Sequence, residues 1–255
     1  MADALVGYTG FVGSNLRRQR PFDALYNSGN IESIAGREFD LLVCAGAPAE
    51  KWKANRDPEA DSRNIQRLLE CLKQVRAHKV IVISTVDVYP VPLAVDEGSP
   101  IDESACHAYG RHRLLLERTI AERFDTMVIR LPGLFGKGLK KNIIYDLLHG
   151  NQIEQVHSES IFQFYHLDNL WADIRIAQTN ALSLVNFATE PVSVREVARN
   201  GFGIDFDNHP AGSPARYDFR SRHAALFGSS AGYLYDKQQV LAALKSFVAA
   251  ERSSP

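Results

Sequence analysis

Short apolar runs alternate with longer amphipathic segments along the first half of this 255-residue chain. The runs ALV at 4–6, FDLLVCA at 39–45 and VIVIS at 80–84 are typical of parallel strands that helices cover on both faces. Residues 58–78 instead carry apolar side chains at helical spacing. Strands that alternate with helices in this way predict β-α-β units, and therefore a parallel sheet with right-handed crossovers.

The same pattern predicts further elements along the chain. The expected strands are 24–27 and 127–130, and the expected helices are 11–20, 109–124, 142–148, 167–177, a short one after the Ser193-x-x-Glu196 capping box, and 236–249. The segment between the third strand and the long helix is interpreted as a polar loop. The chain has no obvious internal repeat or linker, so one main domain with a small C-terminal lobe fits best.

Composition and charge limit the classes of partner. Acids and bases nearly balance, with a formal net charge of -1, which argues against a broad basic surface for nucleic acid. No apolar run approaches the roughly 18–20 residues needed to cross a bilayer, and the first residues lack the parts of a secretory signal. We therefore expect a cytoplasmic protein that binds a small molecule, with neither nucleic acid nor membrane as a partner.

The three cysteines give no sign of a metal site or a disulfide. Cys44, Cys71 and Cys106 lie far apart and show no CxxC spacing. His107 and His112 have no second histidine or carboxylate at the spacing of metal ligands. No metal is therefore expected.

A glycine turn follows the first strand directly and opens the first helix. Gly7, Gly10 and Gly13 form the pattern GxxGxxG. In this context backbone N–H groups and the helix dipole can hold a pyrophosphate, which indicates a dinucleotide-binding site; a glycine-rich turn without a ligand is the plain alternative. The residues of this turn that we expect to contact the cofactor are Gly7, Gly10, Phe11, Val12 and Gly13.

The end of the second strand bears on the choice of dinucleotide. Binders of NAD usually carry an acidic residue there for the adenosine ribose, whereas this chain has Asn27 and Ser28. An amide and a hydroxyl can bond a ribose and would not repel a 2′-phosphate, which Arg17 or Arg18 could reach. Both NAD and NADP stay open as the cofactor.

The run HAYGRHRLLLE places a phenol and a guanidinium one helical turn apart. Tyr109 and Arg113 project from the same face of a helix, so both can approach one ligand. A fixed positive charge favours the phenolate of a tyrosine, whose ordinary pKa is about 10, and so makes it a better base. The plain alternative is that Tyr109 only begins the helix and that Arg113 pairs with Glu117. Thr85, a hydroxyl at the end of the preceding strand, favours the catalytic interpretation.

Five segments in order, GYTGFVGSNL, ISTVDVY, AYGRHRLLLE, RLPGLFG and FQFYHLDN, give the chain a family likeness. It resembles the extended short-chain dehydrogenase/reductase superfamily, in its NAD(P)-dependent nucleotide-sugar epimerase/dehydratase branch, over roughly residues 1–200. The resemblance implies an α/β fold: a Rossmann-like doubly wound parallel sheet with a small C-terminal lobe. We expect residues 1–136 to form the NAD(P)-binding domain and residues 137–255 a smaller, partly interleaved substrate-binding region.

The resemblance also implies roles for individual residues. Thr85 would hydrogen-bond the reacting oxygen, Tyr109 would be the general acid and base, and Arg113 stands where the family has the lysine that holds the nicotinamide ribose and lowers the pKa of the tyrosine. Further cofactor contacts would come from Ala45, Gly46, Ala47 and Pro132.

Three departures from the family pattern are visible. Only residues 29–38 separate the second and third strands, which is too short for the strand and helix that many relatives insert, so the sheet should be trimmed. Arginine, unlike lysine, cannot release a proton, so a proton relay through that amine would have to be rerouted. Gly133 and Phe162 stand where relatives often have the Asn and Arg that help to hold the substrate.

These observations lead to a functional hypothesis and two rivals. We expect an NAD(P)-dependent oxidoreductase or epimerase that acts on a carbinol/carbonyl centre of a sugar-like substrate, with a nucleotide sugar as one candidate. The catalytic residues would be Thr85, Tyr109 and Arg113. The rivals are a non-catalytic NAD(P)-binding redox sensor or regulator and a scaffold with a dead pocket. Resemblance further suggests a homodimer through helices 58–78 and 109–124.

Overall fold

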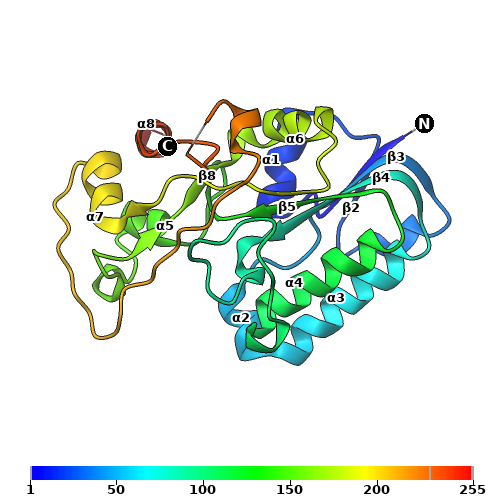
Figure 1. Cartoon of the computed structure of the whole chain (residues 1–255), viewed down its shortest axis with the longest axis horizontal. Coiled ribbons are helices and arrows are strands. Elements are labelled where there is room, and N and C mark those ends of the chain that lie inside the picture. The colour runs from blue at the N-terminus through cyan, green and yellow to red at the C-terminus, as the bar shows by residue number, and fades with distance from the viewer. Residues whose placement is uncertain (1, 230, 254–255) are drawn as a thin grey trace. The chain divides into compact units, whose positions relative to one another are not determined.

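The computed structural model describes residues 2–229 and 231–253. It divides into two compact units, which are described one at a time (Figure 1). The first unit runs as far as Val91 and continues with Gly98–Leu131 and Leu170–Asn186. The second holds Pro92–Glu97, Pro132–Asn169 and the described residues from Phe187 onward. The chain therefore passes from one unit to the other several times.

The first unit is built on a six-stranded sheet in the order β2-β1-β3-β4-β5-β9. Its strands are β1 (Asp3–Val6), β2 (Ala24–Tyr26), β3 (Glu38–Cys44), β4 (Arg76–Thr85), β5 (Thr126–Leu131) and β9 (Leu184–Asn186). All five neighbouring pairs are parallel. The strands at the centre are almost wholly buried, as continuous apolar runs require. The predicted doubly wound parallel sheet is confirmed.

Helices cover both faces of this sheet. They are α1 (Phe11–Gln19), α2 (Lys51–Arg56), α3 (Pro58–Leu72), α4 (Ala108–Ala121) and α6 (Leu170–Thr179). Figure 1 shows α3 and α4 side by side on one face and α1 with α6 on the other. On that second face, the backbone N–H of Trp171 donates to Gln19 Oε1 at 2.8 Å.

The long amphipathic helix is shorter than predicted. It begins where Asp57 accepts the N–H of Ala60 at 3.0 Å, with Pro58 in its first turn, and it buries Ile65 on its apolar stripe. Its predicted continuation to residue 78 is wrong, because residues 76–78 belong to β4 and pair with β3 from Glu38 onward. Strand pairing overrides helical periodicity over these last residues.

The connection between β2 and β3 is as short as the sequence indicated. Residues 27–37 hold a single 3-10 turn, Ile31–Ile34, and no strand. The sheet is therefore trimmed on this side, with β2 as its edge.

The second unit contains two small sheets and a helical layer. In the first sheet β6 (Gly133–Phe135) runs parallel to β8 (Phe164–His166), and in the second β7 (Ile161–Phe162) runs antiparallel to β10 (Val192–Ser193). Its helices are α5 (Ile143–His149), α7 (Val194–Val197), which continues into a π turn, and α8 (Lys237–Ser253). The predicted capping box is present, since Ser193 Oγ accepts the N–H of Glu196 and the Glu196 carboxylate accepts that of Ser193.

Gln163 joins three segments of this unit. Its amide donates to the carbonyls of Thr189 and Phe219 at 2.5 and 2.8 Å and accepts the N–H of Phe219 at 2.9 Å. Because the side chain is 2% exposed, these bonds satisfy an otherwise costly buried amide.

Among the described residues, no helix has both the length and the apolar character that a membrane span requires.

Candidate active site

The glycine turn between β1 and α1 is shaped by close backbone approaches. Gly7 has φ +87°, and a Cβ atom at this position would lie 2.2 Å from the carbonyl oxygen of Ala45. A Cβ atom at Gly13 would lie 2.1 Å from the carbonyl oxygen of Gly7. Both glycines are therefore needed to bring α1 and the turn after β3 against the end of β1.

The first turn of α1 fits an anionic group. Gly10 is the N-cap and offers no side chain to the helix, so the N–H groups of Phe11, Val12 and Gly13 are the ones that an α-helix leaves without an internal acceptor. Such a helix start, next to a turn without side chains, suits the diphosphate of a dinucleotide. The residues present fit the cofactor that the sequence predicted.

The other predicted cofactor residues of the first unit lie near this turn. Asn27 and Ser28 follow β2 and Ala45–Ala47 follow β3, so both segments stand at the carboxyl edge of the sheet on either side of β1. Asn27 Oδ1 already accepts the N–H of Gly29 at 2.9 Å, and Ser28 is exposed. Pro132 belongs to the second unit, so its contact with a cofactor stays a prediction.

Gly10→Ala is expected to weaken dinucleotide binding at this turn while leaving the fold intact. A Cβ atom there would meet only the carbonyl oxygen of Gly7, at 3.3 Å, so the melting temperature should change little. We expect the affinity for NAD or NADP to fall at least tenfold, because the added methyl group occupies space that a phosphate needs beside the backbone. Titration calorimetry with each dinucleotide measures this change. A variant that binds as tightly as the unchanged protein would place the diphosphate elsewhere.

Thr85 and Tyr109 are brought together by the packing of α4 against the end of β4. Thr85 is the last residue of β4, and its hydroxyl accepts the N–H of Asp87 at 3.1 Å. A Cβ atom at Gly110 would lie 2.0 Å from the carbonyl oxygen of Asp87, so only glycine lets the helix come this close. The phenol of Tyr109 therefore lies close to the Thr85 side chain, whose hydroxyl lowers the pKa of the phenol.

The surroundings of Tyr109 favour the protonated phenol in the free protein. Burial raises its pKa above the ordinary value, and the carboxylate of Asp87 acts in the same direction. Arg113, the bond to Thr85 and Lys51 lower the pKa, but burial is the largest effect. The single positive charge of Arg113 therefore does not by itself make Tyr109 a base near neutral pH.

Arg113 is a buried structural cation. It is 2% exposed, and its guanidinium donates to the carboxylate of Asp61 on α3 and to the carbonyl oxygens of Pro48 and Tyr109. The guanidinium carbon lies 4.1 Å from the centre of the Tyr109 ring. Within the described part of the chain, its Nε has no hydrogen-bond partner. That N–H is a buried donor without a protein acceptor.

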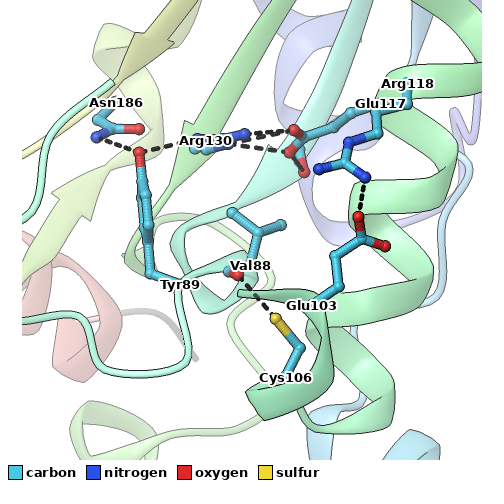
Figure 2. A network of polar contacts seen from close by, with 9 residues as sticks. Val88, Tyr89, Glu103, Cys106, Glu117, Arg118, Arg130 and Asn186 are labelled. Atoms are coloured by element: carbon cyan, nitrogen blue, oxygen red, sulfur yellow. Dashed lines mark hydrogen bonds and ion pairs between the residues drawn. The ribbon is translucent and has the colours of Figure 1, made fainter. Parts of the chain in front are cut away.

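The predicted alternative partner of Arg113 is wrong. Glu117 accepts instead from Ser84 Oγ and from the guanidinium of Arg130, whose Nη2 lies 2.6 Å from Glu117 Oε2 (Figure 2). Arg130 also donates to the Tyr89 hydroxyl at 2.8 Å. This buried network ties β4, α4 and β5 together, and Ser84 within it immediately precedes Thr85 in β4.

Two charged residues near Tyr109 were missed by the sequence analysis. Lys51 Nζ lies 2.6 Å from Asp87 Oδ1, and Asp87 Oδ2 lies 3.5 Å from the hydroxyl of Thr85. Asp87 stands inside the quoted segment ISTVDVY, which could have indicated it. Lys51 could not be found in this way, because its segment was interpreted as a loop and is in fact the start of α2.

One cluster of metal-ligating residue types lies in the second unit. His157, Glu159 and His209 have ligand atoms within 4.8 Å of one another. His157 Nδ1 accepts the N–H of Glu159, and His209 Nε2 bonds the carboxylate of Asp207 at 2.9 Å. Both rings are already engaged in local hydrogen bonds, and we assign no metal there.

Comparison with known proteins places the fold. No family model matches the sequence, and no curated protein matches it. Solved structures do match over the whole chain. They include MoeE5 in complex with UDP-glucuronic acid and NAD (TM-score 0.75, 16% identity, 100% of both chains) and a UDP-galactose 4-epimerase (0.73, 16%, 100% of both). A third is a double mutant of DesIV, a dTDP-glucose 4,6-dehydratase from Streptomyces venezuelae, with NAD and DAU bound (0.74, 16%, 100% of this chain and 98% of that one).

These neighbours match this chain in fold over its whole length. At 16% identity these structures show the fold, and the roles of the individual site residues stay predictions. The resemblance of fold that the five segments indicated is confirmed: the chain has the Rossmann-like fold of solved nucleotide-sugar epimerases and dehydratases.

Proposed function

We propose that this protein is an NAD(P)-dependent enzyme of the extended short-chain dehydrogenase/reductase superfamily, acting on a carbinol/carbonyl carbon of a sugar-like substrate. The observation that carries the proposal is the meeting of Thr85 and Tyr109 at the carboxyl edge of the sheet that also holds the glycine turn. Ligands of open α/β sheets bind in the crevice at this edge. MoeE5, whose structure holds UDP-glucuronic acid and NAD, and DesIV, a dTDP-glucose 4,6-dehydratase whose structure holds NAD, support the same substrate class.

The chain's own residues have separable tasks. The first turn of α1 binds the diphosphate, and Thr85 orients the reacting oxygen through its hydroxyl. Tyr109 gives a proton to that oxygen or takes one from it. When bound, the oxidised dinucleotide supplies a hydride acceptor and a positive charge. Burial of Tyr109 excludes water from the proton that is transferred.

Arg113 has a more limited role than the catalytic one that the sequence suggested. Three hydrogen bonds to Asp61, Pro48 and Tyr109 hold its guanidinium in place. We therefore assign it a positioning role: it fixes the start of α4 and contributes charge beneath the Tyr109 ring. Its Nε is the group with which it would contact a ribose.

The proposal is tested with dinucleotides and a panel of sugar nucleotides. NAD or NADP should raise the melting temperature of the purified protein. Addition of UDP- and dTDP-linked hexoses should then yield an altered sugar, detected by NMR of the products, with at least one panel member. Stabilisation by a dinucleotide without any product would favour the non-catalytic redox sensor. No stabilisation by either dinucleotide would indicate a dead pocket.

The sensor is kept as a second candidate because of two observations. Arg113 is engaged with Asp61, and the pKa of Tyr109 is raised by burial, so the free protein is not poised for proton abstraction. A homodimer through α3 and α4 is a further proposal, which rests on the family resemblance.

A further inference from the structure

Arg113 places a fixed charge beside Tyr109 but cannot exchange a proton with it. When the net reaction oxidises or reduces the substrate, a tyrosine that exchanges a proton with it must release or recover that proton at each turnover. Arg113 stays protonated under all ordinary conditions, and its guanidinium is buried against Asp61. A proton that leaves Tyr109 therefore needs a group other than Arg113.

A chain of polar groups leads from Tyr109 toward solvent on another path. The Tyr109 phenol lies near Thr85, because Gly110 lets α4 approach the backbone of Asp87. The Thr85 hydroxyl lies 3.5 Å from Asp87 Oδ2, and Asp87 Oδ1 lies 2.6 Å from Lys51 Nζ. Tyr109 and Thr85 are 8% and 9% exposed. The side chain of Asp87 is 18% exposed and that of Lys51 38% exposed. Tyr109 and Thr85 are buried and the Lys51 side chain reaches solvent, so the chain connects a buried phenol to a solvated amine.

The position of Lys51 is fixed by α2. This helix begins at Lys51, and one turn later Asn55 Oδ1 accepts the backbone N–H of Tyr109 at 3.0 Å. The same short helix therefore holds the start of α4 and presents the amine. Burial has the largest effect on the pKa of the phenol and raises it, whereas the charge of Lys51 lowers it by the smallest of the named effects.

We propose that Lys51, acting through Asp87 and Thr85, is the exchangeable cation and the proton outlet of Tyr109. A lysine at the position of Arg113 could exchange a proton with Tyr109 from α4. Lys51 would perform this exchange from α2 instead. The proposal deepens the proposed function and rests on it for the role of Tyr109. Lys51 and Asp87 are positioning residues, since both act on substrate through Tyr109.

Each oxidation of substrate would move one proton outward. The substrate hydroxyl gives its proton to the Tyr109 phenolate while its carbon gives a hydride to the oxidised nicotinamide dinucleotide. Tyr109 then passes a proton to the Thr85 oxygen, and Thr85 passes its own to the Asp87 carboxylate. Lys51 releases a proton to water and takes the one from Asp87. The reverse sequence returns a proton when substrate is reduced.

Other titratable groups act on this chain among the described residues. His107, the N-cap of α4, feels both Lys51 and Asp87, and burial lowers its pKa, so it is neutral near pH 7. Arg113 faces the Tyr109 ring from the same helix, and Asp61 neutralises it from α3. Arg113 and Lys51 are therefore the cations that act on Tyr109, and Lys51 is the one that can lose its proton.

The ionisation of Tyr109 can be measured without dinucleotide or substrate. The protein is labelled with 3-fluorotyrosine, whose fluorine makes the phenol more acidic, and its nine tyrosines are followed by fluorine NMR as pH rises. The Tyr109 signal is identified as the one missing in Tyr109→Phe. In Lys51→Gln the ionisation constant of Tyr109 should fall roughly tenfold, because a cation is lost and Asp87 is left uncompensated.

Matched variants show whether the change in the Tyr109 ionisation constant is specific to the charge at Lys51. Lys51→Arg should restore the ionisation constant, since it keeps the charge. Lys53→Gln, on the same helix and with a side chain that is 65% exposed, should leave it unchanged. An unaltered Tyr109 titration in Lys51→Gln, or an equal change in Lys53→Gln, would overturn the proposal. Because Lys51 and Lys53 are both on the surface of a short helix, the melting temperatures should stay close to that of the unchanged protein.

Turnover measurements distinguish proton release by Lys51 from the effect of its charge on Tyr109. With the sugar nucleotide that the unchanged protein converts, Lys51→Arg should be at least tenfold slower although its Tyr109 titrates normally, because arginine does not release a proton. Full activity of Lys51→Arg would refute the outlet. If the protein converts no member of the panel, the proposed function fails, while the fluorine titration still decides whether Lys51 and Tyr109 are coupled.

Discussion

Tyr109→Phe is expected to lower turnover of the sugar substrate by about 10²–10⁴-fold, the usual contribution of a positioned general acid or base. The phenylalanine ring keeps the packing against the guanidinium of Arg113, which lies 4.1 Å from the ring centre, so the fold should be retained. Dinucleotide affinity should stay nearly the same, because the diphosphate is held at the start of α1. Steady-state kinetics and calorimetry on the same preparation measure the two quantities.

A tyrosine of the second unit provides the control for this variant. Tyr145 lies on α5 and contacts the ring of His149. Tyr145→Phe also removes one phenolic hydroxyl, and we expect it to keep both turnover and dinucleotide affinity. If Tyr109→Phe remained as active as the unchanged protein, Tyr109 would not be the group that moves the proton.

The main features of the fold could be predicted because they depend on local pattern. Central strands such as β3 are continuous apolar runs, and the spacing of glycines marks the turn into α1. The elements that were missed lack such a signal. β9 has three residues, and its place beside β5 is decided by pairing alone. The helix α2 has six residues and one buried side chain, so no apolar stripe announces it.

The site could be predicted only in part, for a related reason. Thr85 and Tyr109 stand at points that the chain order defines, the end of a strand and the start of a helix. The partners of charged groups are set by tertiary packing, which spacing does not show. Arg113 was compared with its helical neighbour Glu117, whereas its true partner Asp61 lies 52 residues away in sequence. Lys51 and Asp87 are 36 residues apart.

Asp61→Ala is expected to destabilise the protein by about 3–5 kcal/mol, the usual cost of leaving one member of a buried ion pair without its partner. Asp61 is 5% exposed and binds both Arg113 and His112, the latter at 2.7 Å. Its loss leaves a guanidinium that has no access to water. Unfolding in urea, followed by circular dichroism, gives the change in the free energy of unfolding.

A double variant tells whether Arg113 serves the fold alone. Asp61→Leu with Arg113→Met replaces the ion pair by apolar side chains, and we expect it to recover most of the lost stability. Glu59→Ala, which removes an exposed ion pair with Arg63 from the same helix, should change stability very little. If the double variant is stable and binds dinucleotide normally, the guanidinium is purely structural. A stable double variant that binds dinucleotide poorly would show that the free Nε of Arg113 reaches the cofactor. Failure of the double variant to recover stability over Asp61→Ala would contradict the burial argument itself.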